Sequence, residues 1–266
     1  MTTSTATATV TVDGIGPVPL TVTERGAGRP FLVLHGGAGP QSVEGFAELL
    51  ATSGPGQVLV PVHPGFGGTP RPPHLDTMND LARLYARLLE ERDLTGVTVV
   101  GNSIGGWIAA EMAVLGSPRV SGVVLVDAAG LQIDSHPGAD FFSLTMDQVA
   151  ALSYYRPDAF RIDVASLPEP AKAMMAGNRA ALQVYGGTAM ADPGLLGRLP
   201  SVTVPTLVAW GEADRMIPPE HGQAYAAAIP GAQFLLIREA GHLPQLETPA
   251  QLAQAVRDFS QAHVAG

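Results

Sequence analysis

The chain of 266 residues contains no cysteine, which excludes disulfide bonds and thiolate metal sites. Charged residues make up only 15% of it, and Asp and Glu (24) outnumber Lys and Arg (15), so that the formal net charge is −9. This balance leaves no basic surface for nucleic acid or anionic lipid. No apolar run approaches the roughly 20 residues of a membrane-spanning helix, and the first residues lack the pattern of a secretory signal. We therefore expect a soluble cytoplasmic protein with no nucleic-acid or membrane partner.

Hydrophobic residues are plentiful, at 46% of the chain, and the length suits one large α/β domain. The pattern predicts an opening hairpin (7–12 and 18–23) and further strands near residues 31, 58, 97, 123, 207 and 234. Helical periodicity separates the later strands, at 75–92, 103–115, 219–229 and 249–263. This alternation predicts a mostly parallel sheet that is covered by helices on both faces.

Residues 131–200 interrupt that alternation after the sixth predicted strand. About 70 residues are too many for a bare loop, and helical patterns occur at 159–165 and 170–185. We therefore predict a small helical cap at 131–200, inserted into a core that is formed by residues 1–130 and 201–266. A cleft between the cap and the core is the expected place for a ligand.

The pentapeptide Gly101-Asn102-Ser103-Ile104-Gly105 lies between a β-branched strand (97–100) and a helical run (106–113). A Gly-x-Ser-x-Gly sequence in this setting is typical of a sharp turn that lifts a serine hydroxyl above a parallel sheet. The flanking glycines allow the strand and the helix to approach closely. Ser103 is therefore the candidate nucleophile, and a glycine-rich loop without chemistry is the alternative.

A serine nucleophile needs a base, and the base needs a carboxylate that orients it. Asp214 and His242 each follow a buried strand run, and with Ser103 they give the chain order serine, carboxylate, histidine. Glu212 is a weaker second carboxylate because it lies closer to the strand. Asp214 could instead cap the next helix, and His242 could be an ordinary loop histidine. Their joint order favours a Ser103, His242 and Asp214 triad.

An oxyanion hole is expected after the strand at 31–34, where His35-Gly36-Gly37 follows. We assign its donors to the backbone N–H groups of Gly37 and Ile104, and we regard His35 as structural. A phosphate-binding loop is the competing interpretation, but the glycine spacing fits neither nucleotide fingerprint. No local spacing of His, Asp and Glu indicates a metal site. We therefore expect neither a cofactor nor a metal.

Taken together, these motifs resemble those of the α/β-hydrolase fold family over essentially the whole chain. The resemblance rests on His35-Gly36-Gly37 and on residues 64–68, 101–106, 211–214 and 241–242. It implies an eight-stranded α/β-hydrolase sheet, with a cap after the sixth strand and a serine triad. Family members with an aspartate nucleophile are disfavoured because Ser103 stands at that position. The chain departs from the family at His63, where an aspartate is common, and we expect His63 to pack or hydrogen-bond locally.

The expected substrate is small and largely apolar, with one reacting carbonyl. The candidate substrate-binding residues are Gly36, Trp107, Phe141, Phe142, Tyr154 and Leu243. Arg156, Arg161 and Arg179 could anchor a carboxylate, but a solvated cap surface is the first expectation for each.

We expect hydrolysis of a carboxylic ester or lactone through an acyl-enzyme. The first alternative is C–C bond hydrolysis of a β-diketone or an aromatic ring-fission product, since residues 101–106 and 35–37 resemble hydrolases of ring-cleavage products. Those relatives usually carry tryptophan after the catalytic histidine, where this chain has Leu243. Cofactor-free haloperoxidase chemistry uses the same triad, and a slow-turnover small-molecule receptor is the alternative of another class. Nothing in the sequence indicates the oligomeric state.

Overall fold

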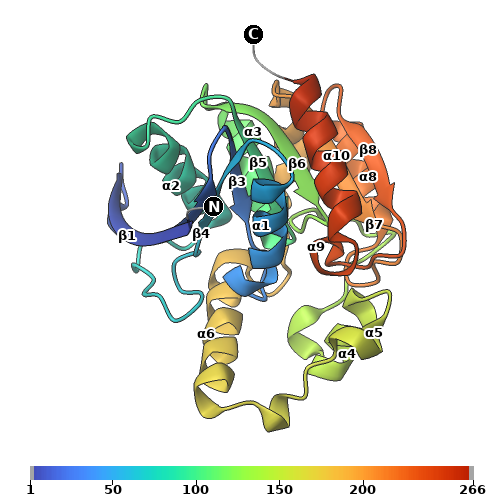
Figure 1. Cartoon of the computed structure of the whole chain (residues 1–266). Coiled ribbons are helices and arrows are strands. Elements are labelled where there is room, and N and C mark those ends of the chain that lie inside the picture. Colours follow the sequence, from blue (N-terminus) through green and yellow to red (C-terminus); the bar gives the residue numbers. More distant parts are fainter. Residues whose placement is uncertain (1–2, 264–266) are drawn as a thin grey trace.

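The computed structural model describes residues 3–263, which contain one eight-stranded sheet of order β1-β2-β4-β3-β5-β6-β7-β8 (Figure 1). The β1–β2 and β2–β4 pairs are antiparallel, and every other neighbouring pair is parallel. The predicted eight-stranded, mostly parallel sheet is therefore confirmed. The strands are β1 (Thr3–Val12), β2 (Gly16–Gly26), β3 (Arg29–Leu34), β4 (Gly56–Pro61), β5 (Val97–Asn102), β6 (Val120–Val126), β7 (Thr206–Gly211) and β8 (Gln233–Ile237).

Helices flank both faces of the sheet because successive side chains of a strand point to opposite sides. In β3, Leu32 and Leu34 join a core formed with α2, α3 and α8, whereas Phe31 and Val33 join a second core formed with α1 and α10. No helix within residues 3–263 is long and apolar enough to cross a membrane. The helices around the sheet are α1 (Glu44–Thr52), α2 (Met78–Glu91), α3 (Ile104–Leu115), α8 (Pro219–Ala228), α9 (Pro244–Glu247) and α10 (Pro249–Ala262).

Local capping sets the helix boundaries and corrects two predictions. Helix α2 begins at Met78 rather than at residue 75, because the Thr77 hydroxyl accepts the Asp80 N–H (3.0 Å) and the Asp80 carboxylate accepts the Thr77 N–H (3.2 Å). The helix predicted over 159–165 is wrong. Helix α5 (Pro157–Phe160) already ends at Phe160. The Asp163 carboxylate then accepts the Ala165 N–H at 3.0 Å and caps a separate 3-10 turn, Val164–Ser166.

The segment 131–200, which we call the inserted segment, carries its own helices and lies beyond one end of the sheet. Figure 1 shows α4, α5 and α6 grouped there, apart from the helices that flank the strands. The chain returns to the start of the segment at Ala191, since Gly130 forms a bridge with Ala191 and accepts the Asp192 N–H at 2.8 Å. The chain thus leaves and re-enters the core at one place. The helices of the segment are α4 (Met146–Ser153), α5, α6 (Glu169–Gly186) and α7 (Leu195–Arg198).

Candidate active site

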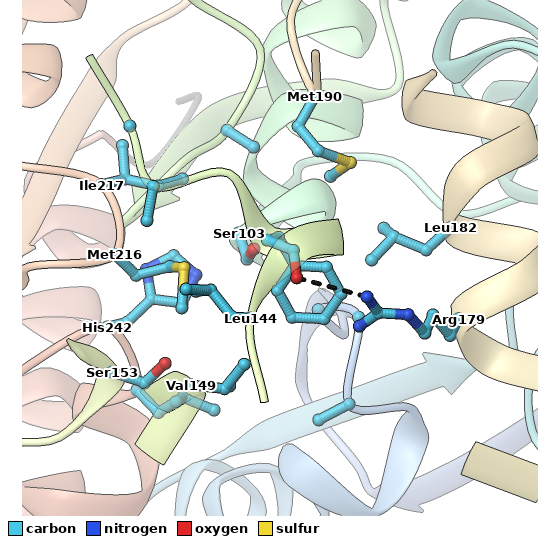
Figure 2. Close-up of a pocket in the computed structure, with 18 of the residues that line it drawn as sticks. Ser103, Leu144, Val149, Ser153, Arg179, Leu182, Met190, Met216, Ile217 and His242 are labelled. Atoms are coloured by element: carbon cyan, nitrogen blue, oxygen red, sulfur yellow. Dashed lines mark hydrogen bonds between the residues drawn. The ribbon is translucent and has the colours of Figure 1, made fainter. Parts of the chain in front are cut away.

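Ser103 lies in the turn between β5 and α3, in a backbone conformation that residues other than glycine rarely adopt. Its φ is 57° and its ψ is −117°. Hydrogen bonds hold this strained turn on both sides, since the Ser103 N–H donates to Val126 O (2.9 Å) and its carbonyl accepts the N–H groups of Trp107 (3.1 Å) and Ala129 (3.0 Å). The turn presents the hydroxyl to a large cavity, whose wall includes Ser103 (Figure 2).

The glycines on either side of Ser103 are required by close backbone contacts. A Cβ atom at Gly101 would lie 2.0 Å from the Gly105 carbonyl oxygen, and one at Gly105 would lie 2.3 Å from the Leu34 carbonyl oxygen. These neighbours are backbone atoms, which have little freedom to move aside. The Gly-x-Ser-x-Gly pattern thus has a structural cause in the packing of β5, α3 and β3.

Asp214 and His242 are in direct contact although 28 residues separate them. The His242 Nδ1 atom lies 2.8 Å from Asp214 Oδ2, and Asp214 Oδ1 accepts the N–H groups of Met216 (2.8 Å) and Ile217 (3.0 Å). The two backbone N–H groups bind Oδ1, so Oδ2, which faces the ring, is available to accept an imidazole N–H. This places the proton of neutral His242 on Nδ1 and leaves the Nε2 lone pair for another partner.

The backbone of His242 is anchored to the core and to the inserted segment. Its N–H donates to Ser153 O (2.6 Å), and its carbonyl accepts the Asn102 side-chain N–H (2.9 Å) from the residue before Ser103. Ser103 and His242 therefore share one framework and line the same cavity, as Figure 2 shows. Glu212 is exposed instead and accepts the Glu239 N–H at 2.8 Å, outside this cluster.

The loop after β3 lies directly against the serine. A Cβ atom at Gly36 would be 3.2 Å from the Ser103 Cβ, and both Gly36 and Gly37 line the cavity. Among residues 3–263, the Gly37 N–H donates no hydrogen bond. Ile104 is the first residue of α3, so its N–H has no acceptor within the helix. The two predicted donors therefore flank the serine and have no competing acceptor in these elements.

The cavity above Ser103 has a volume of about 960 Å³ and lies between the carboxyl ends of the strands and the inserted segment. Four of the predicted substrate-binding residues line it: Gly36, Phe141, Tyr154 and Leu243. Much of the remaining wall is apolar and was not predicted from the sequence. It includes Leu144, Val149, Leu182, Met190, Met216 and Ile217, which Figure 2 shows around the serine.

The two other predicted substrate-binding residues, Trp107 and Phe142, do not line the cavity. Trp107 is buried beneath it, and its ring fills the space beside Gly130, where a Cβ would lie 2.7 Å from the indole. Phe142 packs edge-on against Phe141, with ring centroids 5.4 Å apart. Neither residue could be placed from the sequence, because a residue that is close to a site residue along the chain can still point away from the cavity.

The profile of the "Alpha/beta hydrolase family" matches residues 31–255, which is most of the chain. The chain belongs to the α/β hydrolase family. A 2-hydroxy-6-oxo-6-(2'-aminophenyl)hexa-2,4-dienoic acid hydrolase from Metapseudomonas resinovorans is 26% identical to it, over 92% of this chain and 88% of that protein. Lipase 3 from Moraxella sp. is also 26% identical, over 87% of this chain and 77% of that protein.

Solved structures show the same fold over nearly the whole length of this α/β hydrolase. A thermophilic esterase from Thermogutta terrifontis superimposes with a TM-score of 0.79 and 25% identity, covering 98% of this chain and all of that chain. A serine hydrolase involved in carbazole degradation has a TM-score of 0.73 and 25% identity, covering 97% of this chain and all of that one. The relatives thus include a lipase, an esterase and a hydrolase of a hexadienoic acid.

His35 and His63 form a buried pair behind the loop that carries Gly36 and Gly37. Their rings lie 3.7 Å apart, and His63 Nε2 donates to His35 O (2.9 Å) while its Nδ1 accepts the Tyr85 hydroxyl. His35 Nε2 accepts the His63 N–H at 3.1 Å. Burial lowers the pKa of His35 to about 4, and burial together with His35 lowers the pKa of His63. Both rings are therefore neutral near pH 7 and serve a structural role in this α/β hydrolase.

Arg179 lies in the cavity wall, which corrects the expectation of a solvated surface position. Figure 2 shows its side chain reaching from α6 toward the cavity, and Nη2 donates to the carbonyl oxygens of Phe142 (2.6 Å) and Phe141 (3.4 Å). Its guanidinium also lies 5.0 Å from the centre of the Phe141 ring. Arg156 and Arg161 are exposed, as expected, and Arg161 pairs with Asp147 at 2.6 Å.

One cluster of carboxylate and imidazole groups comes together within residues 3–263, at Asp127, Asp214 and His242. No local sequence pattern marks this cluster, because its members follow three different strands. The His242–Asp214 contact of 2.8 Å is a direct hydrogen bond, and Asp214 Oδ1 already accepts two backbone N–H groups. The contacts of Asp214 and of His242 Nδ1 are therefore those of a hydrogen-bonded pair. The signal for Asp127 was its position directly after a predicted strand.

Proposed function

We propose that this α/β hydrolase is a serine hydrolase that cleaves a small, largely apolar carboxylic ester or lactone through an acyl-enzyme. The observation that carries the proposal is the hydrogen bond of 2.8 Å between His242 Nδ1 and Asp214, beside a serine held in a strained turn. A base with this orientation can take a proton on Nε2. Lipase and esterase relatives support the same reaction class.

In the proposed mechanism, Ser103 Oγ attacks the carbonyl carbon while His242 Nε2 takes the hydroxyl proton. The N–H groups of Gly37 and Ile104 stabilise the oxyanion, at about 3–4 kcal/mol for each donor in comparable sites. The imidazolium then gives its proton to the leaving alkoxide. A water that is deprotonated by His242 attacks the acyl-enzyme, and the acid leaves as Ser103 regains its proton. Asp214 holds the imidazole and stabilises its positive charge.

The inserted segment supports an apolar substrate, and we propose that it serves as the cap. Its α4 and α6 contribute Val149 and Leu182 to the cavity wall, opposite the loops that follow the strands. A cavity of about 960 Å³ can hold a ligand of drug-like size. Binding energy would come from the apolar wall, whereas the polar groups near Ser103 would orient the reacting carbonyl.

Hydrolysis of a C–C bond in a carboxylate-bearing ring-fission product is the second candidate, and the position of Arg179 favours it. A guanidinium in a largely apolar wall can bind a carboxylate in bidentate fashion. A relative that is named a hydrolase of a hexadienoic acid supports this candidate. Leu243, which lines the cavity where those relatives usually carry tryptophan, argues against it.

The deciding experiment is a panel of p-nitrophenyl esters of increasing chain length, several lactones and a ring-fission dienoate, with Ser103→Ala as the blank. We expect the highest kcat/KM for a short or medium-chain ester or a lactone. A clear preference for the dienoate would replace the ester proposal with the C–C candidate. Tight ligand binding without turnover of any compound would favour a receptor.

Arg179→Met separates the two candidates within the same panel. Loss of a charged hydrogen bond to a carboxylate should lower kcat/KM for the dienoate by about tenfold or more. Neutral esters should change little. Arg161→Met is the matched control, because Arg161 is an exposed arginine of the same segment. An equal effect on neutral and acidic compounds would show that Arg179 acts through folding of the segment.

A further inference from the structure

Asp127 is a buried carboxyl group that the proposed mechanism does not use. It directly follows β6, is 0% exposed and has a φ of 46°, which is rare for a residue other than glycine. Its N–H donates to Ala209 O (3.1 Å), and its Oδ1 accepts the Gly211 N–H (2.8 Å). Both contacts come from β7, so the neighbouring strand fixes the position of the carboxyl group.

The second carboxyl oxygen, Oδ2, has no hydrogen-bond partner among residues 3–263. A carboxyl oxygen of Asp127, one of Asp214 and a ring nitrogen of His242 lie within 4.8 Å of one another. The Nδ1–H of His242 is already donated to Asp214. Two buried carboxylates side by side cannot both be satisfied as anions, because each then only accepts hydrogen bonds. A proton on one of them removes the conflict.

We propose that Asp127 is protonated when the enzyme is active and donates its O–H to Asp214, as a positioning residue for the Asp214–His242 pair. The proposal rests on the proposed triad function. In this arrangement the Asp127 O–H fills the remaining acceptor site of the Asp214 carboxylate and fixes its orientation. One negative charge, rather than two, then lies behind His242 and matches the one positive charge that forms on the ring.

The distribution of hydrogen bonds decides which carboxyl carries the proton. Asp214 accepts N–H groups from Met216, Ile217 and His242, whereas Asp127 accepts one backbone N–H. Hydrogen bonds that are donated to a carboxylate stabilise its charged form. The negative charge therefore stays on Asp214, and the proton stays on Asp127.

The charges around Asp127 act in the same direction. Burial raises the pKa of Asp127 well above its usual value, and the negative charge of Asp214 raises it further. Glu247 of α9 adds a third acidic group, while the Gly211 N–H opposes the shift. His242, whose ring nitrogen lies within 4.8 Å of a carboxyl oxygen of Asp127, is a further titratable group that faces it.

Asp127→Asn and Asp127→Ala test the proposal against each other. The amide of Asn keeps an acceptor for the Gly211 N–H and a permanent N–H donor for Asp214, so it mimics a protonated Asp127 in shape. Ala removes both. Glu212→Gln is the matched control, since it neutralises an exposed carboxylate two residues from Asp214. The readouts are kcat/KM as a function of pH with the best ester, and infrared difference spectra between the wild type and Asp127→Asn at pH 7.

We expect Asp127→Ala to lose about tenfold or more in kcat/KM. Asp127→Asn should have a kcat/KM within about threefold of the wild type. The acid limb of its pH profile, where kcat/KM falls with falling pH, should not move. The infrared spectrum should show the C=O stretch of a protonated acid in the wild type alone. If Asp127 were an anion, Asp127→Asn would remove a nearby negative charge and shift the acid limb to lower pH by about one unit. That shift, or a missing acid band, would overturn the proposal.

The infrared band does not depend on turnover, so it decides the protonation state even if Asp127→Ala fails to fold. Failure of the triad function has a different signature, in which Ser103→Ala keeps its activity while the band is still present. The two results together assign any failure to one proposal.

Discussion

Acid should weaken this protein through the buried histidine pair behind the proposed oxyanion loop. His35 has a pKa lowered to about 4 by burial, against 6.5 for a free histidine. In the unfolded chain His35 takes up a proton as the pH falls below 6.5, whereas the folded chain holds it neutral until about pH 4. The folded state therefore binds fewer protons in this window, and the free energy of unfolding falls as the pH falls through it.

The size of the effect follows from the two pKa values. A shift from 6.5 to about 4 corresponds to about 3 kcal/mol when fully expressed, and to about 2 kcal/mol at pH 5 relative to pH 7.5. His63 acts in the same direction, because burial and His35 lower its pKa as well. Asp127 acts in the opposite direction, since its raised pKa lets the folded state keep a proton that the unfolded chain releases. A comparison of variants therefore isolates the histidine.

Urea unfolding at pH 7.5 and pH 5 should be measured for the wild type and for His35→Gln. The wild type should lose about 2 kcal/mol more than the variant between the two pH values, because the variant lacks the group that titrates. His74→Gln, which removes an exposed histidine, is the control for the substitution itself. Equal losses in the wild type and His35→Gln, within about 0.5 kcal/mol, would refute the assignment of acid sensitivity to His35.

Gly105→Ala should lower the free energy of unfolding by more than about 1 kcal/mol, because its Cβ would lie 2.3 Å from the Leu34 carbonyl oxygen. Gly45→Ala in α1, with no atom within 4 Å of the added carbon, should be neutral or stabilising, and equal melting temperatures for the two variants would contradict the packing argument. Ser103→Ala and His242→Ala should each abolish ester turnover, and the double variant should lose no more than either, since triad members act as a unit; losses that multiply would show separate roles. Dialysis against EDTA should leave turnover unchanged, and zinc-restorable inactivation would contradict the placement of His242 in a triad.

The fold could be predicted because its signals are local. Each strand of the parallel sheet is a short apolar run that ends at a turn, and the strand at 97–100 is followed at once by the Ser103 turn. The helix predicted at 159–165 failed because its apolar periodicity competes with Asp163, whose carboxylate caps a new turn. Whether a side chain binds a nearby backbone N–H depends on local geometry, which the spacing of apolar residues does not indicate.

The candidate site, like the fold, could be predicted from the sequence only where its signals are local. Ser103, Asp214 and His242 could be proposed because parallel strands bring their carboxyl ends to one edge, and the structure places all three there. The wall of the cavity could not, because it depends on which faces of α4 and α6 turn inward after the segment packs on the core. For this reason the sequence predicts a solvated position for Arg179, whereas the structure puts it in the cavity wall.

The central claim is that Ser103 is the nucleophile, and covalent labelling tests it most directly. The protein should be incubated with a serine-directed phosphonate ester, and the adduct measured by intact mass and located by peptide mapping. We predict one adduct per chain, on Ser103, that forms in step with loss of ester turnover, and no adduct on Ser103→Ala. Full inactivation with the adduct on another residue, or turnover that persists in chains labelled at Ser103, would contradict the account.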